Sequence, residues 1–226
     1  MTARIIYDNV DAAADLRRIE RIVALFSEKL WDEVANQAQN LRNEALEAGS
    51  VIDENDFEIL CEEYRSDAER LKQHLVRAAV VMAYAAFEKA LLEIAMLFHI
   101  IKKSDRPKKK ENSAFLRAID ALENCGITNF KTKIEWERAN TIRHVRNCLA
   151  HDAALRDGQQ EKLEVSAWNL NMPGLSVLEV DSLLQDVWEL RLEPYLAGWS
   201  CLVLEKCLAF IVLEINQSHK ISSAAP

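Results

Sequence analysis

Glycine and proline are scarce in this sequence, which has 5 glycines and 4 prolines among 226 residues. An average chain carries about three times that share, because the two residues together make up roughly 12 per cent of proteins. All-β folds need glycine and proline in their many turns, so the scarcity argues against a sandwich or a barrel. A mostly helical chain is the alternative that the composition favours.

The sequence also lacks the patterns typical of disulfide frameworks, signal peptides and membrane-spanning helices. The five cysteines are odd in number and form no CxxC pair, so neither a disulfide framework nor a zinc site is predicted. The N-terminus has no apolar core of signal-peptide length. The two most apolar stretches, residues 76–101 and 199–215, both carry charged residues and are expected to be buried helices. We therefore expect a cytoplasmic protein with no membrane association.

Common cofactor motifs are absent as well. The sequence contains no GxGxxG or GxxxxGK[ST] loop, no HExxH, no EF-hand loop and no GxSxG elbow. It therefore predicts no bound cofactor and no metal site. The net charge of −8 gives no general affinity for polyanions, so a nucleic-acid site requires a local concentration of basic residues.

Two such concentrations are present. Residues 102–110, KKSDRPKKK, hold six basic residues and one acid and include Lys108, Lys109 and Lys110. Residues 131–146 hold five basic residues and two acids. Solubility of a surface loop is the simpler explanation of the first run, and contact with phosphates is the alternative.

Apolar residues recur every three or four positions over most of the chain, which predicts amphipathic helices. The expected helices cover residues 11–48, as one helix or two, and residues 53–101, 113–126, 129–151 and 181–215. Residues 162–170 and 175–180 partly alternate and predict a small β-hairpin after the fourth of these helices. Pro194 predicts a boundary or a kink within the last one.

The expected fold is therefore mostly α, a helical bundle with one small β-hairpin. We assign residues 1–50 to an N-terminal helical extension, 51–217 to a helical domain and 218–226 to a disordered tail. No repeat and no linker rich in glycine and serine divides the chain.

The residues best suited to chemistry lie in TIRHVRNCLAHD, residues 141–152. Arg143, Asn147 and His151 are spaced i, i+4, i+8 and form one slanting stripe on a helix. Such a set suits attack on a phosphodiester, because a guanidinium neutralises charge on the phosphate, a histidine exchanges a proton near neutral pH, and an amide orients either group. Arg146, however, lies about 140° around a regular helix from His151. A second copy of the chain, or unwinding at His151, would let these groups converge.

The run from Arg146 to His151, RNCLAH, resembles the Arg-x4-6-His signature of HEPN domains, in the common form with a polar residue after the arginine. The context is also similar. A basic amphipathic helix leads into the motif, and the upstream helix AYAAFEKALLEIA, residues 83–95, is similar to the aromatic and acidic second helix of many HEPN proteins. The resemblance spans about residues 71–215.

The resemblance implies a helical-bundle endoribonuclease of the bacterial stand-alone type. Such enzymes are usually homodimers whose two motifs face one cleft, and they often serve in phage defence, toxin–antitoxin modules or RNA processing. Cleavage needs no metal and leaves a 2′,3′-cyclic phosphate and a 5′-OH. On this interpretation Arg146 stabilises the phosphorane, His151 is the general acid or base, and Asn147 positions the phosphate or His151. We assign Arg143, His144 and the lysines at 108–110 to RNA binding.

Partners follow from the same interpretation: RNA, a second copy of the chain, and an antitoxin or another defence-system protein. Self-association is also expected because the apolar Ile142, Val145 and Leu149 lie beside cationic residues on the motif helix and would need a partner surface.

Simpler explanations stay open. Arg146 and Asn147 would merely pair on the helix, and His151 would satisfy its C-terminal carbonyls. Glu88 is a candidate to steady a motif side chain, with an ordinary salt bridge or an exposed carboxylate as the simpler explanation. The alternative function is a non-catalytic HEPN-like interaction or nucleotide-binding module.

Overall fold

The computed structural model describes residues 11–47, 53–97, 114–150, 154–155, 172–180 and 187–223. The fold is mostly α with a small antiparallel sheet, as the sequence predicts. The expected strand at 162–170, the basic run at 102–110 and His151 lie outside the described residues.

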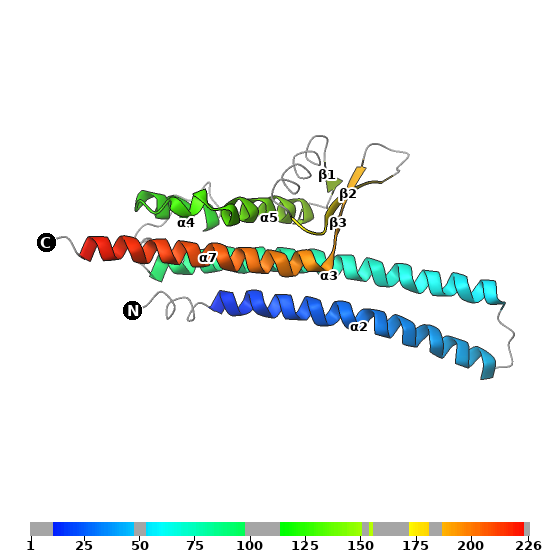
Figure 1. Ribbon diagram of the computed structural model, residues 1–226. Coiled ribbons are helices and arrows are strands. Elements are labelled where there is room, and N and C mark those ends of the chain that lie inside the picture. Colours follow the sequence, from blue (N-terminus) through cyan, green and yellow to red (C-terminus); the bar gives the residue numbers. More distant parts are fainter. Residues whose placement is uncertain are drawn as a thin grey trace.

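Three long helices form the body of the molecule. They are α2 (Asp11–Glu47), α3 (Glu54–Leu97) and α7 (Pro194–Ser223). Helices α3 and α7 lie in the middle, α2 packs against both on one side, and α4 (Ala114–Asn124) and α5 (Ile134–Ala150) cover the other side (Figure 1). The 3-10 helix η1 (Asn129–Thr132) joins α4 to α5. Helix α7 runs past residue 217, where the sequence places the end of the helical domain.

Most of the predicted helices are present in the structure. Two helix boundaries lie at residues whose backbone preferences favour a helix end or a helix start. Helix α4 ends just before Gly126, whose φ of 77° is a conformation that glycine adopts at little cost. Helix α7 begins at Pro194, because proline at the first helical position lacks only an N–H that has no helical partner. Pro194 is therefore a boundary and not a kink.

The sheet corrects one expectation. Strand β3 (Val187–Leu192) occupies part of the range predicted as a helix, and β2 (Leu175–Val180) pairs with it from Leu175 opposite Leu192 to Val180 opposite Val187. The described hairpin therefore runs over 175–192, whereas the expected strand at 162–170 lies outside the described residues. The two-residue β1 (Ala154–Leu155) pairs with the other edge of β3, which gives the order β1-β3-β2.

Alternation explains why the helical prediction failed at β3. Leu190 and Leu192 are fully buried, whereas Arg191 between them is exposed. A period of two therefore governs this segment. The spacing from Val187 to Leu190 fits a helix as well, and over so short a run the two periods cannot be told apart.

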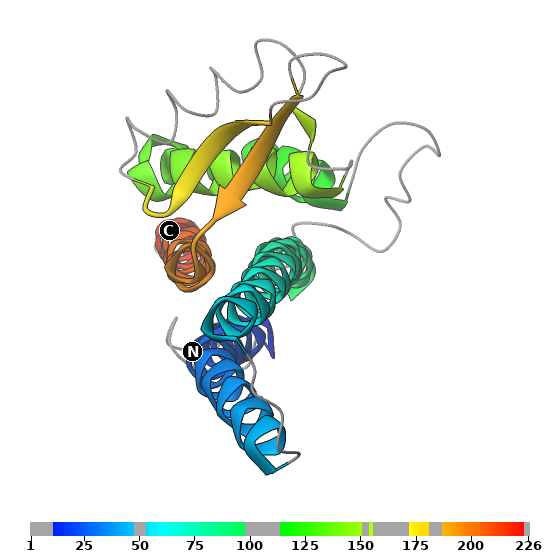
Figure 2. The same cartoon turned by 90° about the vertical axis from the view of Figure 1, so that its right-hand side faces the viewer.

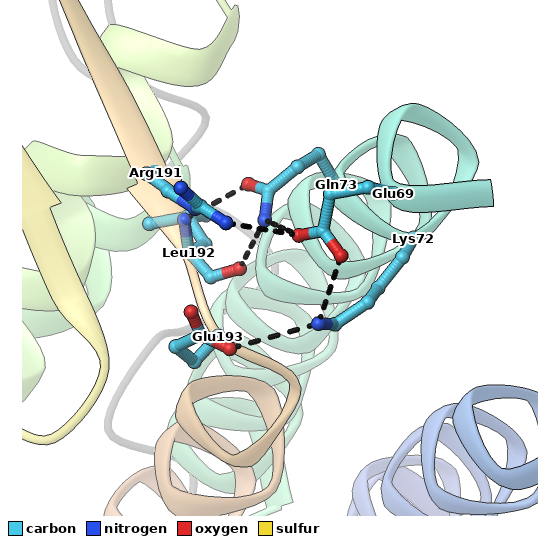
Figure 3. A network of polar contacts seen from close by, with 6 residues as sticks. All are labelled: Glu69, Lys72, Gln73, Arg191, Leu192 and Glu193. Carbon is cyan, nitrogen blue, oxygen red and sulfur yellow. Dashed lines mark hydrogen bonds and ion pairs between the residues drawn. The ribbon is translucent and has the colours of Figure 1, made fainter. Parts of the chain in front are cut away.

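Side chains of α3 fasten β3 to the bundle (Figure 3). The Gln73 amide acts like a neighbouring strand: its Nε2 donates to the Leu192 carbonyl (2.9 Å), and its Oε1 accepts from the Leu192 N–H (3.0 Å). Lys72 bridges Glu69 (3.2 Å) and Glu193 (3.8 Å) beside this pair. Arg77 donates to the Leu190 carbonyl one turn further along α3 (3.0 Å). The sheet is therefore held against the middle of α3, on the side where α5 also packs (Figure 2).

Helix α7 is apolar on most sides because its neighbours cover it. By length and composition its segment Pro194–Ser218 could cross a membrane, and 56% of its most apolar window is buried inside the fold. Helix α7 packs against α2, α3, α5 and η1. An enclosed core helix has the same composition, so this finding is weak evidence for a membrane span.

A buried carboxylate on α7 fixes the connection into α5. Glu214 is only 7% exposed, and its Oε1 accepts the backbone N–H groups of Thr128 and Asn129, while Oε2 accepts that of Phe130, each at 2.8 Å. These donors are the free N–H groups at the start of η1. The carboxylate therefore sets where α5 begins.

We expect Glu214→Gln to lower the free energy of unfolding by about 2 kcal/mol, because the new amide loses the charge and turns an NH₂ group toward backbone donors. Urea denaturation of the whole chain measures this. The matched control is Glu205→Gln on the same helix, which weakens the exposed Arg17–Glu205 ion pair and should cost under about 1 kcal/mol. Equal losses in the two variants would show that the Glu214 contacts are not what stabilises η1.

Candidate active site

Helix α5 carries the candidate residues along one edge of a buried face. Its core residues recur every three positions and are Trp136, Ala139, Ile142 and Val145. Trp136 stacks on Phe115 of α4 (ring centroids 5.9 Å apart) and meets Phe130 of η1 edge to face (4.9 Å). These aromatic contacts fix the rotation of α5 and so determine which of its polar residues face α3.

Burial of Ile142 and Val145 corrects one argument for self-association. Both side chains are 1% exposed, and Leu149 packs partly buried against the same core. The partner surface that they need is supplied by the chain itself. These apolar residues therefore give no reason to expect a dimer.

Arg146 and Asn147 lie together in the last turns of α5. Both are half-buried, and Arg146 Nη1 donates a hydrogen bond to Asn147 Oδ1 (3.0 Å). Arg146 Nε is buried and has no hydrogen-bond partner among the described residues. The amide thus holds one side of the guanidinium, and the Nε donor is not used by any described group.

Glu88 of α3 faces the two arginines of the motif helix. It is half-buried, and its pKa is raised because burial disfavours the carboxylate, although the charges of Arg146 and Arg143 act in the opposite direction. The structure thus places Glu88 close enough to Arg143 and Arg146 for their charges to act on its carboxyl group. The signal in the sequence was the place of Glu88 in the segment 83–95, which is similar to the acidic second helix of HEPN proteins.

Tyr84 lies beneath this group. Its side chain is 1% exposed, and its hydroxyl has no hydrogen-bond partner among the residues described. Burial and the nearby Glu88 raise the pKa of the hydroxyl well above its ordinary value, so it remains a neutral donor at all physiological pH values. Tyr84 lies in the stretch 76–101, which the sequence predicts to be a buried helix, but its place beside Glu88 and Arg146 was not predicted.

Arg143 and His144, the two residues of α5 that we assign to RNA binding, differ in their surroundings and in their charge. The Arg143 guanidinium lies 5.6 Å from the centroid of the Phe115 ring of α4, a cation–π distance. His144 is exposed, and its pKa is lowered by partial desolvation and by the charge of Arg143. Its imidazole is therefore neutral at pH 7 and offers hydrogen bonds in place of a positive charge.

The remaining predicted site residues cannot be placed. His151 follows Ala150, the last residue of α5, and lies outside the described residues together with Lys108, Lys109 and Lys110. What the structure does bring together is Arg143, Arg146 and Asn147 from α5 with Glu88 and Tyr84 from α3. Within the described ranges, no group of three or more histidine, cysteine, aspartate or glutamate side chains could hold a metal ion.

Comparisons with models of protein families, with curated proteins and with solved structures found no match for this chain. The HEPN resemblance therefore depends on the motif residues and their context alone.

We expect Glu88→Gln to raise the melting temperature at pH 7 and to leave it unchanged at about pH 4. The folded-state pKa of Glu88 lies above its ordinary value of 4.5, so the folded chain binds more protons than the unfolded chain between the two pKa values. Stability therefore falls as pH rises through that window, and the neutral amide avoids this loss. Thermal melts of both proteins from pH 4 to pH 8 measure it. A variant that melts lower at pH 7 would show that Glu88 is a stabilising partner of the arginines.

Proposed function

We propose that this protein is an endoribonuclease of the HEPN type that cleaves RNA without a metal ion. The observation that carries the proposal is the pairing of Arg146 with Asn147 at the end of α5, beside Glu88 and Arg143 and directly before His151 in the sequence. Two arginines, an amide and a histidine within nine residues supply the groups that in-line attack on a phosphodiester needs.

The chemistry assigns each group a step. The ribose 2′-oxygen attacks the phosphorus, its proton passes to a base, and the 5′-oxygen leaves with a proton from an acid, which gives a 2′,3′-cyclic phosphate and a 5′-OH. His151 exchanges one of these protons. The Arg146 guanidinium stabilises the negative charge that grows on the non-bridging oxygens. Asn147 acts through its hydrogen bond to Arg146, as a positioning residue.

The proposal includes a homodimer. Each chain supplies one His151, and two proton transfers need two groups, so two motifs that share one substrate make a more complete site. RNA in the cytoplasm is the proposed substrate, and phage defence or a toxin–antitoxin module is the proposed setting.

The second candidate is a non-catalytic module. It is favoured by the same hydrogen bond between Arg146 and Asn147, because a half-buried guanidinium held by an amide also serves as a structural pair. In that case the motif stabilises the end of α5 and the protein acts through a bound nucleotide or partner.

Incubation of the purified chain with mixed RNA and excess EDTA distinguishes the two candidates. We expect fragments whose 3′ ends resist ligation until a phosphatase that opens cyclic phosphates has acted, and whose 5′ ends accept phosphate from a kinase directly. Intact RNA after treatment with folded protein would favour the non-catalytic module. Cleavage that EDTA abolishes would contradict the proposed mechanism.

Neutralising the basic run should separate binding from chemistry. We expect Lys108→Gln, Lys109→Gln and Lys110→Gln together to weaken RNA binding and to flatten its salt dependence by roughly 0.7 per lost phosphate contact on a logarithmic plot. The rate at saturating RNA should stay nearly unchanged, because these charges act in the ground-state complex. Filter binding over a salt series, paired with single-turnover cleavage, measures both. An unchanged salt slope would assign the run to solubility alone.

A further inference from the structure

Strand β3 has different neighbours along the edge that faces away from β2. Strand β1 pairs with residues 188–189. Beyond them, Arg77 of α3 donates a hydrogen bond to the Leu190 carbonyl group (3.0 Å). The Gln73 amide then bonds to both the carbonyl and the N–H group of Leu192 (2.9 Å and 3.0 Å; Figure 3). This edge of β3 is therefore filled first by a strand and then by two side chains of α3.

The register of the sheet explains why α3 reaches these backbone groups. The Glu193 N–H donates to the Gly174 carbonyl group directly before β2 (2.8 Å), so the backbone of residue 193 points toward β2. In an antiparallel sheet, successive residues of a strand direct their backbone groups to opposite edges. Those of Leu190 and Leu192 therefore point away from β2, to the edge on which β1 pairs.

The pairing of β1 shows which residue a longer strand would bring to Leu192. Ala154 lies opposite Glu189, and the two strands are antiparallel. Counted back three residues in the same register, His151 would lie opposite Leu192. This is the position that the Gln73 amide fills.

Arg77 fills the preceding position of the same ladder. In the register of β1, Ala153 would lie opposite Leu190, whose carbonyl group accepts the hydrogen bond from Arg77. Side chains of α3 therefore lie where a longer β1 would continue, which explains why the described strand begins at Ala154.

A position in the ladder would separate His151 from the other groups of the candidate active site. Helix α5 ends at Ala150, and Arg146 and Asn147 lie in its last turns. Pairing with Leu192 would fix the His151 backbone at the edge of the sheet. A general acid or base has to lie within hydrogen-bond distance of the reacting group, which Arg146 also has to contact. The proposed chemistry therefore requires that His151 stay out of the ladder.

We propose that Gln73 is a positioning residue for His151. By pairing with Leu192, the Gln73 amide excludes the histidine from the sheet and keeps it at the end of α5, near Arg146. Arg77 supports this arrangement at the preceding position. The proposal rests on the catalytic role proposed for His151, and it adds a residue of α3 that acts without touching the substrate.

Gln73→Met tests this role, because methionine has a similar length and no amide. We expect the single-turnover rate at saturating RNA to fall about 10-fold, while the affinity for RNA stays within about 2-fold. In the free protein, we expect the His151 N–H to exchange with solvent at least about 10-fold more slowly than in the wild type, because Leu192 can now accept it. Amide hydrogen exchange of the whole chain, followed by NMR, measures this.

Lys72→Met is the matched control. Lys72 precedes Gln73 on α3 and bridges Glu69 (3.2 Å) and Glu193 (3.8 Å; Figure 3), so its loss also loosens the attachment of β3. The position at Leu192 stays filled, and we expect cleavage and the exchange of the His151 N–H to stay within about 2-fold of the wild type. An equal loss of cleavage in the two variants would show that only the general attachment of the sheet matters, and it overturns the proposal.

Hydrogen exchange separates this proposal from the proposed function. If the wild type does not cleave RNA, the proposed function is wrong, and the exchange of the His151 N–H still decides whether Gln73 keeps this residue out of the ladder. An exchange rate that Gln73→Met leaves unchanged overturns the proposal. Should this variant fail to fold, Arg77→Met gives the same test at Ala153, where we expect the N–H to exchange more slowly.

Discussion

His151→Ala is expected to lower the single-turnover rate of RNA cleavage by about 100-fold or more, while the affinity for RNA stays within about 2-fold. A general acid or base contributes in the transition state, where the proton moves, and adds little to the ground-state complex. The measurement pairs cleavage at saturating RNA with filter binding at low salt. The same assay excludes a contaminating nuclease, because purified variant and wild type carry the same contaminants.

Two controls define what His151 does. His74→Ala removes an exposed histidine of α3 and should leave cleavage and binding unchanged. His144→Ala removes an imidazole that is neutral at pH 7, so it should change binding by no more than about 3-fold at that pH. If His151→Ala instead lowers binding and the melting temperature together, His151 holds the end of α5 and the proposed catalytic role is wrong.

The helices could be predicted from the sequence because they have periodic apolar faces, and two of them have a boundary that a single residue marks. Gly126 ends α4 and Pro194 begins α7, and both act through their own backbone preferences. Strand β3 could not be predicted in this way. Its six residues are held by β2 and by Gln73, which lies 119 residues away from Leu192 in the sequence. Such distant contacts override local periodicity.

The motif helix illustrates a second limit. Sequence periodicity shows that Ile142 and Val145 share a face, but a helix face buried by its own chain has the same pattern as one buried by a partner. In the fold, α3 and α7 cover that face. The sequence could not show that Glu88 lies beside Arg143 and Arg146 for the same reason. The rotation of α3 relative to α5 decides which side chains of the two helices meet, and periodicity does not reveal that rotation. The α5 residues of the site were found because they are contiguous.

Arg146→Gln is expected to lower the cleavage rate by about 100-fold or more and also to lower the melting temperature. The first effect follows from loss of the charge that stabilises the phosphorane. The second follows because Arg146 is one of the two positive charges that oppose the desolvation of Glu88. Arg146→Lys should recover part of the stability but little activity, since an ammonium keeps the charge without the fork of donors.

The two effects of Arg146→Gln can be separated through Glu88. In the double variant Glu88→Gln, Arg146→Gln, no carboxylate is left to be desolvated, so we expect the melting temperature to return close to that of Glu88→Gln alone. Cleavage should stay at the level of Arg146→Gln, because the charge next to the phosphate is still missing. Arg138→Ala is the matched control: its guanidinium lies 5.7 Å from the Trp199 ring, so its loss should reduce stability and leave single-turnover cleavage intact. Recovery of cleavage together with stability in the double variant would show that Arg146 serves the fold, and the non-catalytic module would then be the better account of the protein.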